Sequence, residues 1–147
     1  MPHNHEWQTR IKAIEREDLA TRQAIDRFQE SARRDPTILR GDLRYREIVR
    51  ASDHLEGTSI IRLFAEFETG LRQYWHQARG TDPGARGLLE RLAAMLGIPD
   101  EQQNNAHRVR EYRNSLVHER EEITNEISIG EARHHLAHFF SLLPPKW

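Results

Sequence analysis

The segment IIRLFAEFETGLRQYW, residues 60–75, decides the fold that the sequence predicts. It contains no proline, and its apolar side chains recur at intervals of three and four residues: Ile60, Leu63, Phe64, Phe67, Leu71, Tyr74 and Trp75. This period is typical of an α-helix with one broad apolar face. We therefore expect the central core helix here, from a cap at Thr58 or Ser59 to about Ala78, with its aromatic side chains used for packing.

Segments with helical periodicity flank this core helix on both sides. Glycine, proline or capping signals bound each of them, and the expected ranges are 6–33, 42–54, 88–96, 100–121 and 128–143. Asp100 is the expected cap of the fourth segment, and Ser128 with Glu131 forms a capping box for the fifth. The sequence thus predicts an all-α fold, an up-and-down bundle of four to five main helices with a long N-terminal helix.

The N-terminal helix is unusually charged, and its apolar residues form a narrow stripe: Trp7, Ile11, Ile14, Leu19, Ala24, Ile25 and Phe28. Two arrangements would bury such an apolar stripe. The helix either packs along the bundle or pairs with another chain.

Composition limits the class of protein. A length of 147 residues argues for one domain, and a formal charge of −1 excludes a globally basic nucleic-acid binder, so any RNA contact would be local. The absence of cysteine excludes disulfides and thiolate zinc sites. No run of 18 apolar residues and no apolar signal region occurs, so we expect a soluble cytoplasmic protein with no membrane partner.

The hexad RNSLVH, residues 113–118, contains an arginine, an asparagine and a histidine, and it is the strongest candidate for a functional site. At 100° per residue, His107, Arg110, Asn114 and His118 fall near one helix face. Arg113 lies about 140° around the helix from His118, but its long side chain can reach the same volume. The alternative is that these are solvated surface residues, which is the commoner fate of titratable side chains on an amphipathic helix.

Glu68 lies at the edge of the buried face of the core helix. An acid at that position is either the ion-pair partner of an arginine at the edge of the core or part of a polar site. Elsewhere, His134 and His138 have metal-ligand spacing, but no carboxylate stands on the neighbouring turn, and we expect no metal site.

Two segments resemble the HEPN superfamily of helical domains. Arg113-Asn114-x-x-x-His118 matches its Arg-x4–6-His motif, in the form with Asn directly after the Arg, and Glu68-Thr-Gly-Leu71-Arg72 resembles the acidic segment of an earlier core helix. The resemblance covers about residues 58–144. It implies one HEPN-like domain over residues 1–147, in which residues 1–57 form an N-terminal helical extension.

The resemblance implies a metal-independent endoribonuclease that needs no cofactor. The RNA 2′-hydroxyl would attack the adjacent phosphate and leave a 2′,3′-cyclic phosphate. His118 would act as general acid or base, Arg113 would neutralise phosphate charge, and Asn114 would bind the phosphate or hold His118. Glu68 would orient Arg113 or His118, and Arg110 would give secondary RNA binding.

Family resemblance also implies a homodimer whose two motif helices share one composite site. Active HEPN ribonucleases are often toxins or antiphage effectors restrained by an antitoxin, which would be a protein partner. Two other interpretations stay open: a non-catalytic HEPN-fold module that binds a partner or a nucleotide, and an unrelated helical adaptor.

Overall fold

The computed structural model describes residues 4–118 and 125–147, and the elements within them are all helical. Five α-helices and one short 3-10 helix follow in order: α1 (Asn4–Arg34), η1 (Pro36–Ile38), α2 (Tyr45–Arg79), α3 (Ala85–Leu96), α4 (Asp100–Val117) and α5 (Ile129–Ser141). The predicted all-α bundle with a long N-terminal helix is confirmed. None of the described helices combines the length and apolar character needed to cross a membrane.

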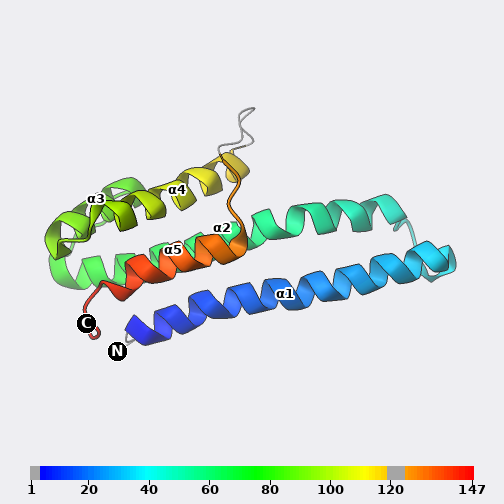
Figure 1. Cartoon of the computed structure of the whole chain (residues 1–147), viewed down its shortest axis with the longest axis horizontal. Coiled ribbons are helices and arrows are strands. Elements are labelled where there is room, and N and C mark those ends of the chain that lie inside the picture. Colours follow the sequence, from blue (N-terminus) through cyan, green and yellow to red (C-terminus); the bar gives the residue numbers. More distant parts are fainter. Residues whose placement is uncertain (1–3, 119–124) are drawn as a thin grey trace.

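Helices α1 and α2 form a long antiparallel hairpin on which the other helices pack (Figure 1). Helix α2 contacts each of the other four helices, and α5 lies against α1, α2 and α4. Helix α2, which contains residues 60–75, is therefore the central helix of the bundle.

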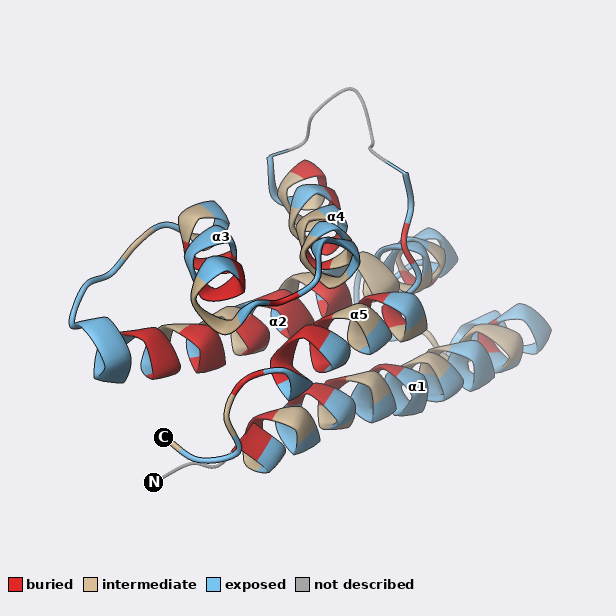
Figure 2. Ribbon diagram, turned by 60° about the vertical axis from the view of Figure 1, so that its left-hand side comes forward, coloured by how far each residue is buried: buried red, intermediate tan, exposed pale blue. Residues whose placement is uncertain are grey.

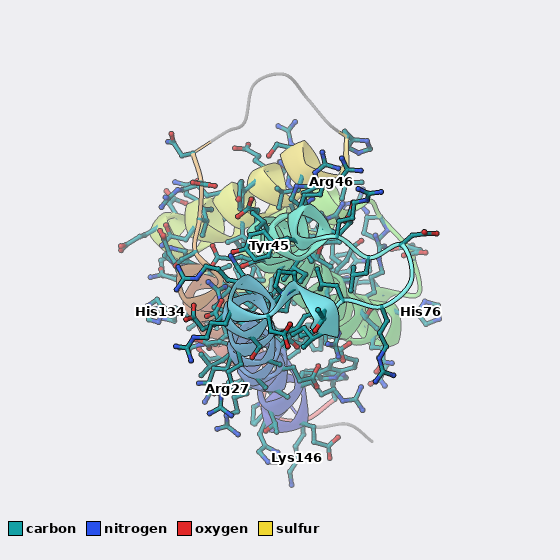
Figure 3. All side chains as sticks on the ribbon, turned by 90° about the vertical axis from the view of Figure 1, so that its right-hand side faces the viewer. Arg27, Tyr45, Arg46, His76, His134 and Lys146 are labelled. Atoms are coloured by element: carbon teal, nitrogen blue, oxygen red, sulfur yellow. The ribbon has the colours of Figure 1, made fainter. Side chains whose placement is uncertain are left out.

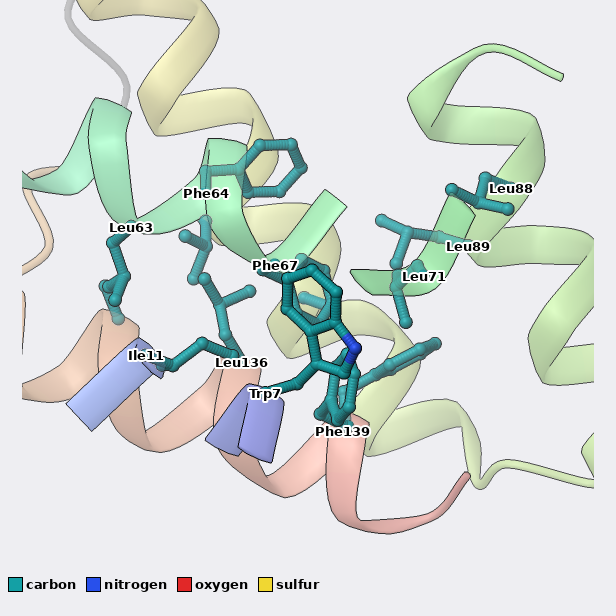
Figure 4. Close-up of a cluster of buried hydrophobic side chains, with 14 of the residues drawn as sticks. Trp7, Ile11, Leu63, Phe64, Phe67, Leu71, Leu88, Leu89, Leu136 and Phe139 are labelled. Carbon is teal, nitrogen blue, oxygen red and sulfur yellow. The ribbon is translucent and has the colours of Figure 1, made fainter. Parts of the chain in front are cut away.

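The seven apolar residues of that segment are all buried, with exposed fractions of 9% or less. Figure 4 shows side chains from α1, α2, α3 and α5 meeting around Phe67. The ring of Phe67 lies 5.7 Å from that of Phe139 and 6.2 Å from that of Phe140, in edge-to-face contacts. These contacts join α2 to α5, and they agree with the prediction that the aromatics of this segment serve packing.

The predicted break between the segment 42–54 and a helix capped at Thr58 or Ser59 is wrong, because α2 runs without interruption through Gly57 and Thr58. Thr58 caps no helix start, and its hydroxyl donates to the carbonyl of His54 within the helix. A Cβ at Gly57 would lie 3.4 Å from Cδ2 of Leu116, an ordinary van der Waals distance, so α4 packs beside α2 at this position. A glycine that the local sequence rule takes as a stop thus lies in the interior of a long helix.

The large buried side chains of the N-terminal helix lie in its first half, and in the second half Ala32 is buried. Trp7, Ile11 and Ile14 are buried, whereas Leu19 is 55% exposed and Phe28 is 38% exposed. Figure 2 shows that this second half of α1 extends beyond α5 and is largely exposed. The stripe predicted to run to Phe28 therefore ends near Asp18, because α5 covers no more of α1 than its first half.

Some helix ends match the prediction. Helix α1 ends at Arg34 against an expected 33, α3 ends at Leu96 as expected, and the Ser128 hydroxyl accepts from the N–H of Glu131 at the start of α5. Asp100 does not cap α4, because the N-cap is Pro99, whose carbonyl accepts from the N–H of Gln103. Helix α4 ends at Val117 rather than at the predicted residue 121, and residues 119–121 lie outside the described part.

Gly70 should tolerate no larger residue, because two aromatic rings lie where its side chain would begin. An added Cβ would lie 2.7 Å from Cε2 of Phe140 and 2.9 Å from Cδ2 of Trp7. We expect Gly70→Ala to lower the free energy of unfolding by about 1–3 kcal/mol in urea denaturation, as overpacking does. Gly84→Ala is the control, since nothing lies within 4 Å of a Cβ there, and equal losses in both variants would contradict the close packing.

Candidate functional site

A carboxylate from α2 meets a guanidinium from α4 at the edge of the core. The Nη2 of Arg113 donates to Oε2 of Glu68 over 3.2 Å, although the two residues stand 45 positions apart. Both side chains are partly buried, with exposed fractions of 21% for Arg113 and 19% for Glu68. The ion pair is less screened than one at the surface, yet solvent reaches both groups.

Two further side chains hold the Arg113 guanidinium in place. Its Nη1 donates to Oδ1 of Asn114 over 3.0 Å, and its Cζ lies 4.7 Å from the centre of the Phe64 ring. Phe64 and Glu68 stand one turn apart on α2, so one helix face supplies both a ring and a carboxylate to the cation. The structure thus brings together Glu68, Arg113 and Asn114 of the predicted site residues.

Arg72 is a member of this cluster that the sequence analysis did not assign. Its Nε donates to Oε1 of Glu68 over 3.1 Å, its Nη2 donates to the same oxygen, and its Nη1 donates to the Asp82 carboxylate and the Pro83 carbonyl. Glu68 therefore lies between two guanidinium groups. The four-residue spacing of Glu68 and Arg72 on a helix is the signal that could have identified this pair.

His118 lies apart from that cluster. It is the first residue after α4, it is exposed, and its backbone N–H donates to the carbonyl of Asn114 over 3.0 Å. Among residues 4–118 and 125–147, no hydrogen bond or ion pair joins its side chain to Arg113, Asn114 or Glu68. The imidazole and the guanidinium share one end of α4 without touching.

Arg110 belongs to a separate pair. Its Nε donates to Nδ1 of His107 over 3.3 Å, and only 15% of its side chain is exposed. The face that the sequence predicts for His107, Arg110, Asn114 and His118 is thus divided. The first two contact one another, and Asn114 contacts Arg113.

Burial lowers the pKa of His107, and the positive charge of Arg110 lowers it further. A folded-state pKa below the unfolded value near 6.5 means that the unfolded chain binds more protons below that pH. We therefore expect the free energy of unfolding to fall as the pH drops from about 6.5 through the lower folded-state pKa, with no contribution from His107 above that range. Urea denaturation between pH 7.5 and pH 5 should show a shallower loss in His107→Gln than in the wild type, and parallel curves would contradict this role.

Tyr112 on α4 is buried in the core. Burial raises the pKa of its hydroxyl, and the nearby carboxylates of Glu126 and Glu56 raise it further. The phenol is therefore neutral and faces negative charge.

The histidines of α5 form no metal site in the described part of the chain. His134 points outward at the edge of the molecule (Figure 3), and its ring lies 6.2 Å from that of His138. No group of three or more His, Cys, Asp or Glu side chains among the described residues is placed to hold a metal ion.

The chain was compared with known protein families, proteins and structures. No family model, curated protein or solved structure matches the chain.

Proposed function

We propose that this chain is a metal-independent endoribonuclease of HEPN type, which cleaves RNA by attack of the 2′-hydroxyl and leaves a 2′,3′-cyclic phosphate. The observation that supports this most is the ion pair between Glu68 and Arg113, with Asn114 on the same guanidinium. A carboxylate facing the motif arginine from the earlier helix is what the resemblance to HEPN domains leads one to expect.

Arg113 is suited to bind a phosphate. Its contacts with Glu68 and Asn114 occupy two of the five N–H donors of the guanidinium, and 21% of the side chain is exposed. A phosphate oxygen can accept from the remaining donors, and negative charge that grows in the transition state would be neutralised there. Glu68, Arg72 and Phe64 would restrict the guanidinium to one orientation, which lowers the entropic cost of binding.

The reaction requires two proton transfers and no external reactant. The 2′-oxygen forms a bond to phosphorus as the bond from phosphorus to the 5′-oxygen breaks, so the 2′-hydroxyl loses a proton and the 5′-oxygen gains one. His118 is exposed at the end of α4 and can approach an RNA strand bound along that helix. A histidine serves either transfer near neutral pH.

One His118 cannot serve as base and acid in the same step. We therefore include in the proposal a homodimer in which two copies of α4 contribute two Arg113 and two His118 side chains to one composite site. This part rests on the resemblance. So does the proposed setting, a toxin or antiphage effector restrained by an antitoxin or another regulatory protein.

One observation favours a second candidate, a non-catalytic HEPN-fold module that binds a partner or a nucleotide. Arg113 is already engaged by Glu68 and Asn114, and the His118 side chain lies outside that cluster. Under this proposal Arg113 would bind a phosphate or carboxylate of a ligand without any bond being broken.

The two candidates differ in the fate of RNA. We expect the purified protein in EDTA to cleave labelled single-stranded RNA and a tRNA pool, leaving 2′,3′-cyclic phosphate ends. Oligonucleotides of the same sequence with 2′-deoxy sugars should stay intact, because they lack the attacking hydroxyl. Arg113→Ala protein purified in parallel controls for contaminating nucleases. Binding of RNA without cleavage of any substrate would favour the non-catalytic module.

A further inference from the structure

The end of the hairpin where α1 is connected to α2 is positively charged in an otherwise acidic chain. Residues 27–50 contain seven arginines, four carboxylates and no lysine, which gives a formal charge of +3. The whole chain carries −1, so the remaining residues carry −4. All seven arginines are exposed: Arg27, Arg33, Arg34, Arg40, Arg44, Arg46 and Arg50. A local positive field of this kind attracts polyanions.

More than half of these arginines are not neutralised by a neighbouring acid. Arg33 and Arg34 both pair with Glu30, and Arg46 pairs with Glu47. The other four form no ion pair with any residue that the structure describes: Arg27, Arg40, Arg44 and Arg50. Their guanidinium groups can therefore contact phosphates, which arginine binds through two parallel hydrogen bonds.

Tyr45 places an aromatic ring among these arginines. It is the first residue of α2 and is 37% exposed. Its hydroxyl accepts from Nε2 of Gln29 over 3.3 Å, which ties the ring to α1. In Figure 3, which faces this end of the hairpin, Arg46 lies on one side of Tyr45 and Arg27 on the other. Exposed rings beside basic side chains are typical of surfaces on which the bases of single-stranded nucleic acids stack.

This combination favours a nucleic acid over other polyanions. An acidic peptide has carboxylates for the arginines but no bases for the Tyr45 ring. An anionic membrane would be bound through an apolar helix face, whereas Phe28 and Leu43 are only 38% and 41% exposed. Arginine suits a nucleic acid in both respects, because its planar group pairs with phosphates and stacks on rings.

We propose that this end of the hairpin, residues 27–50, anchors single-stranded RNA. The choice of RNA among nucleic acids rests on the proposed function. Tyr45 stands 23 residues before Glu68 on one continuous helix, a separation of about 35 Å at about 1.5 Å per residue. Asp53 and Glu56 on the intervening turns are acidic, so the anchor is separate from the Glu68–Arg113–Asn114 cluster. It would hold a long RNA at a distance from the phosphate that Arg113 contacts.

The test measures binding of a fluorescein-labelled 2′-O-methyl RNA dodecamer to the full chain by fluorescence polarisation. This probe keeps the backbone charge and the bases but lacks the attacking hydroxyl, so its binding does not depend on cleavage. Arg40→Ala combined with Arg50→Ala should raise the dissociation constant about tenfold. It should also reduce the slope of log affinity against log salt by about 1.4, because each phosphate contact to a single strand contributes about 0.7.

Two variants of Tyr45 test the ring by itself. Tyr45→Ala should raise the dissociation constant about tenfold without changing the salt slope, because stacking involves no charge. Tyr45→Phe should bind as the wild type does, since the ring is kept. Wild-type affinity in Tyr45→Ala would contradict stacking at this position.

A matched double variant separates the anchor from general attraction between opposite charges. Arg79→Ala combined with Arg91→Ala removes the same charge from exposed positions on α2 and α3, and it should change the dissociation constant less than twofold. Equal weakening in the two double variants, or unchanged binding in Arg40→Ala with Arg50→Ala, would overturn the proposal. A labelled dodeca-glutamate peptide or phosphatidylserine vesicles bound as tightly as the RNA would overturn RNA as the occupant.

Failure of this proposal and failure of the ribonuclease proposal give different results. Binding that depends on Arg40, Arg50 and Tyr45, without cleavage of any RNA, would support the anchor and contradict the ribonuclease. Cleavage of RNA together with unchanged binding in these variants would contradict the anchor alone. The three side chains are exposed, so we expect the variants to fold, and thermal unfolding of each checks this.

Discussion

Replacing Phe67 with alanine should lower the free energy of unfolding by about 3–5 kcal/mol, the largest stability effect that we expect from one side chain. Phe67 has no exposed surface, and its ring lies within 6.2 Å of the rings of Phe64, Phe139 and Phe140. The substitution removes contacts between α2 and α5 and leaves a cavity that the surrounding rings fill only in part. Urea denaturation followed by circular dichroism measures the change.

Phe28→Ala is the matched control for this prediction. It deletes the same atoms from the second half of α1, where the phenylalanine is 38% exposed. We expect a loss below about 1 kcal/mol there, because little apolar surface returns to water. Comparable losses in the two variants would mean that the centre of the core does not lie at Phe67.

The sequence was sufficient to predict the parts of the fold that depend on local pattern. The apolar period of residues 60–75 located the central helix, and Ser128 with Glu131 located the start of α5. These signals are short in range. Their physical basis, a repeating apolar face and a side-chain cap, lies within a few residues of the place that they mark.

Features that depend on distant contacts were not predictable in this way. The sequence predicts a helix stop at Gly57, but α2 continues through it, and Leu116, 59 residues later, packs beside it. The exposure of Leu19 and the burial of Asp18 depend on where α5 stops covering α1, which no local period encodes. Tertiary packing overrides local propensity at both places.

The candidate site shows the same limit. Helical spacing placed Asn114 and His118 on one face, but it also placed Arg113 about 140° away from His118. The long Arg113 side chain was expected to reach the same volume, and it contacts Glu68 and Asn114 instead. The contact between Glu68 and Arg113 joins two helices, and spacing within either helix could not reveal it.

The largest functional effects that we expect are those of His118→Ala and Arg113→Ala on RNA cleavage. Loss of a general acid or base lowers the rate about 10²–10⁴-fold, and loss of a group that stabilises the transition-state charge lowers it about 10²–10³-fold. Neither change should unfold the protein. His118 is exposed beyond the last turn of α4, and Glu68 keeps its contact with Arg72 when Arg113 is removed. Initial cleavage rates under single-turnover conditions, beside thermal unfolding of each variant, separate activity from stability.

Four further variants determine whether such losses belong to this site. Arg113→Lys keeps the charge but lacks the planar fork that contacts Glu68 and Asn114 together, so cleavage should stay at least tenfold below the wild type. His134→Ala removes an exposed histidine from α5 and should leave cleavage unchanged. Glu68→Gln should reduce cleavage about 10²-fold if Glu68 orients Arg113. Glu66→Gln, two residues away on the same helix, should leave cleavage unchanged.

Cleavage that survives in His118→Ala at the wild-type rate would remove His118 from the site. Equal losses in Glu66→Gln and Glu68→Gln would show that the ion pair with Arg113 has no special part in the reaction.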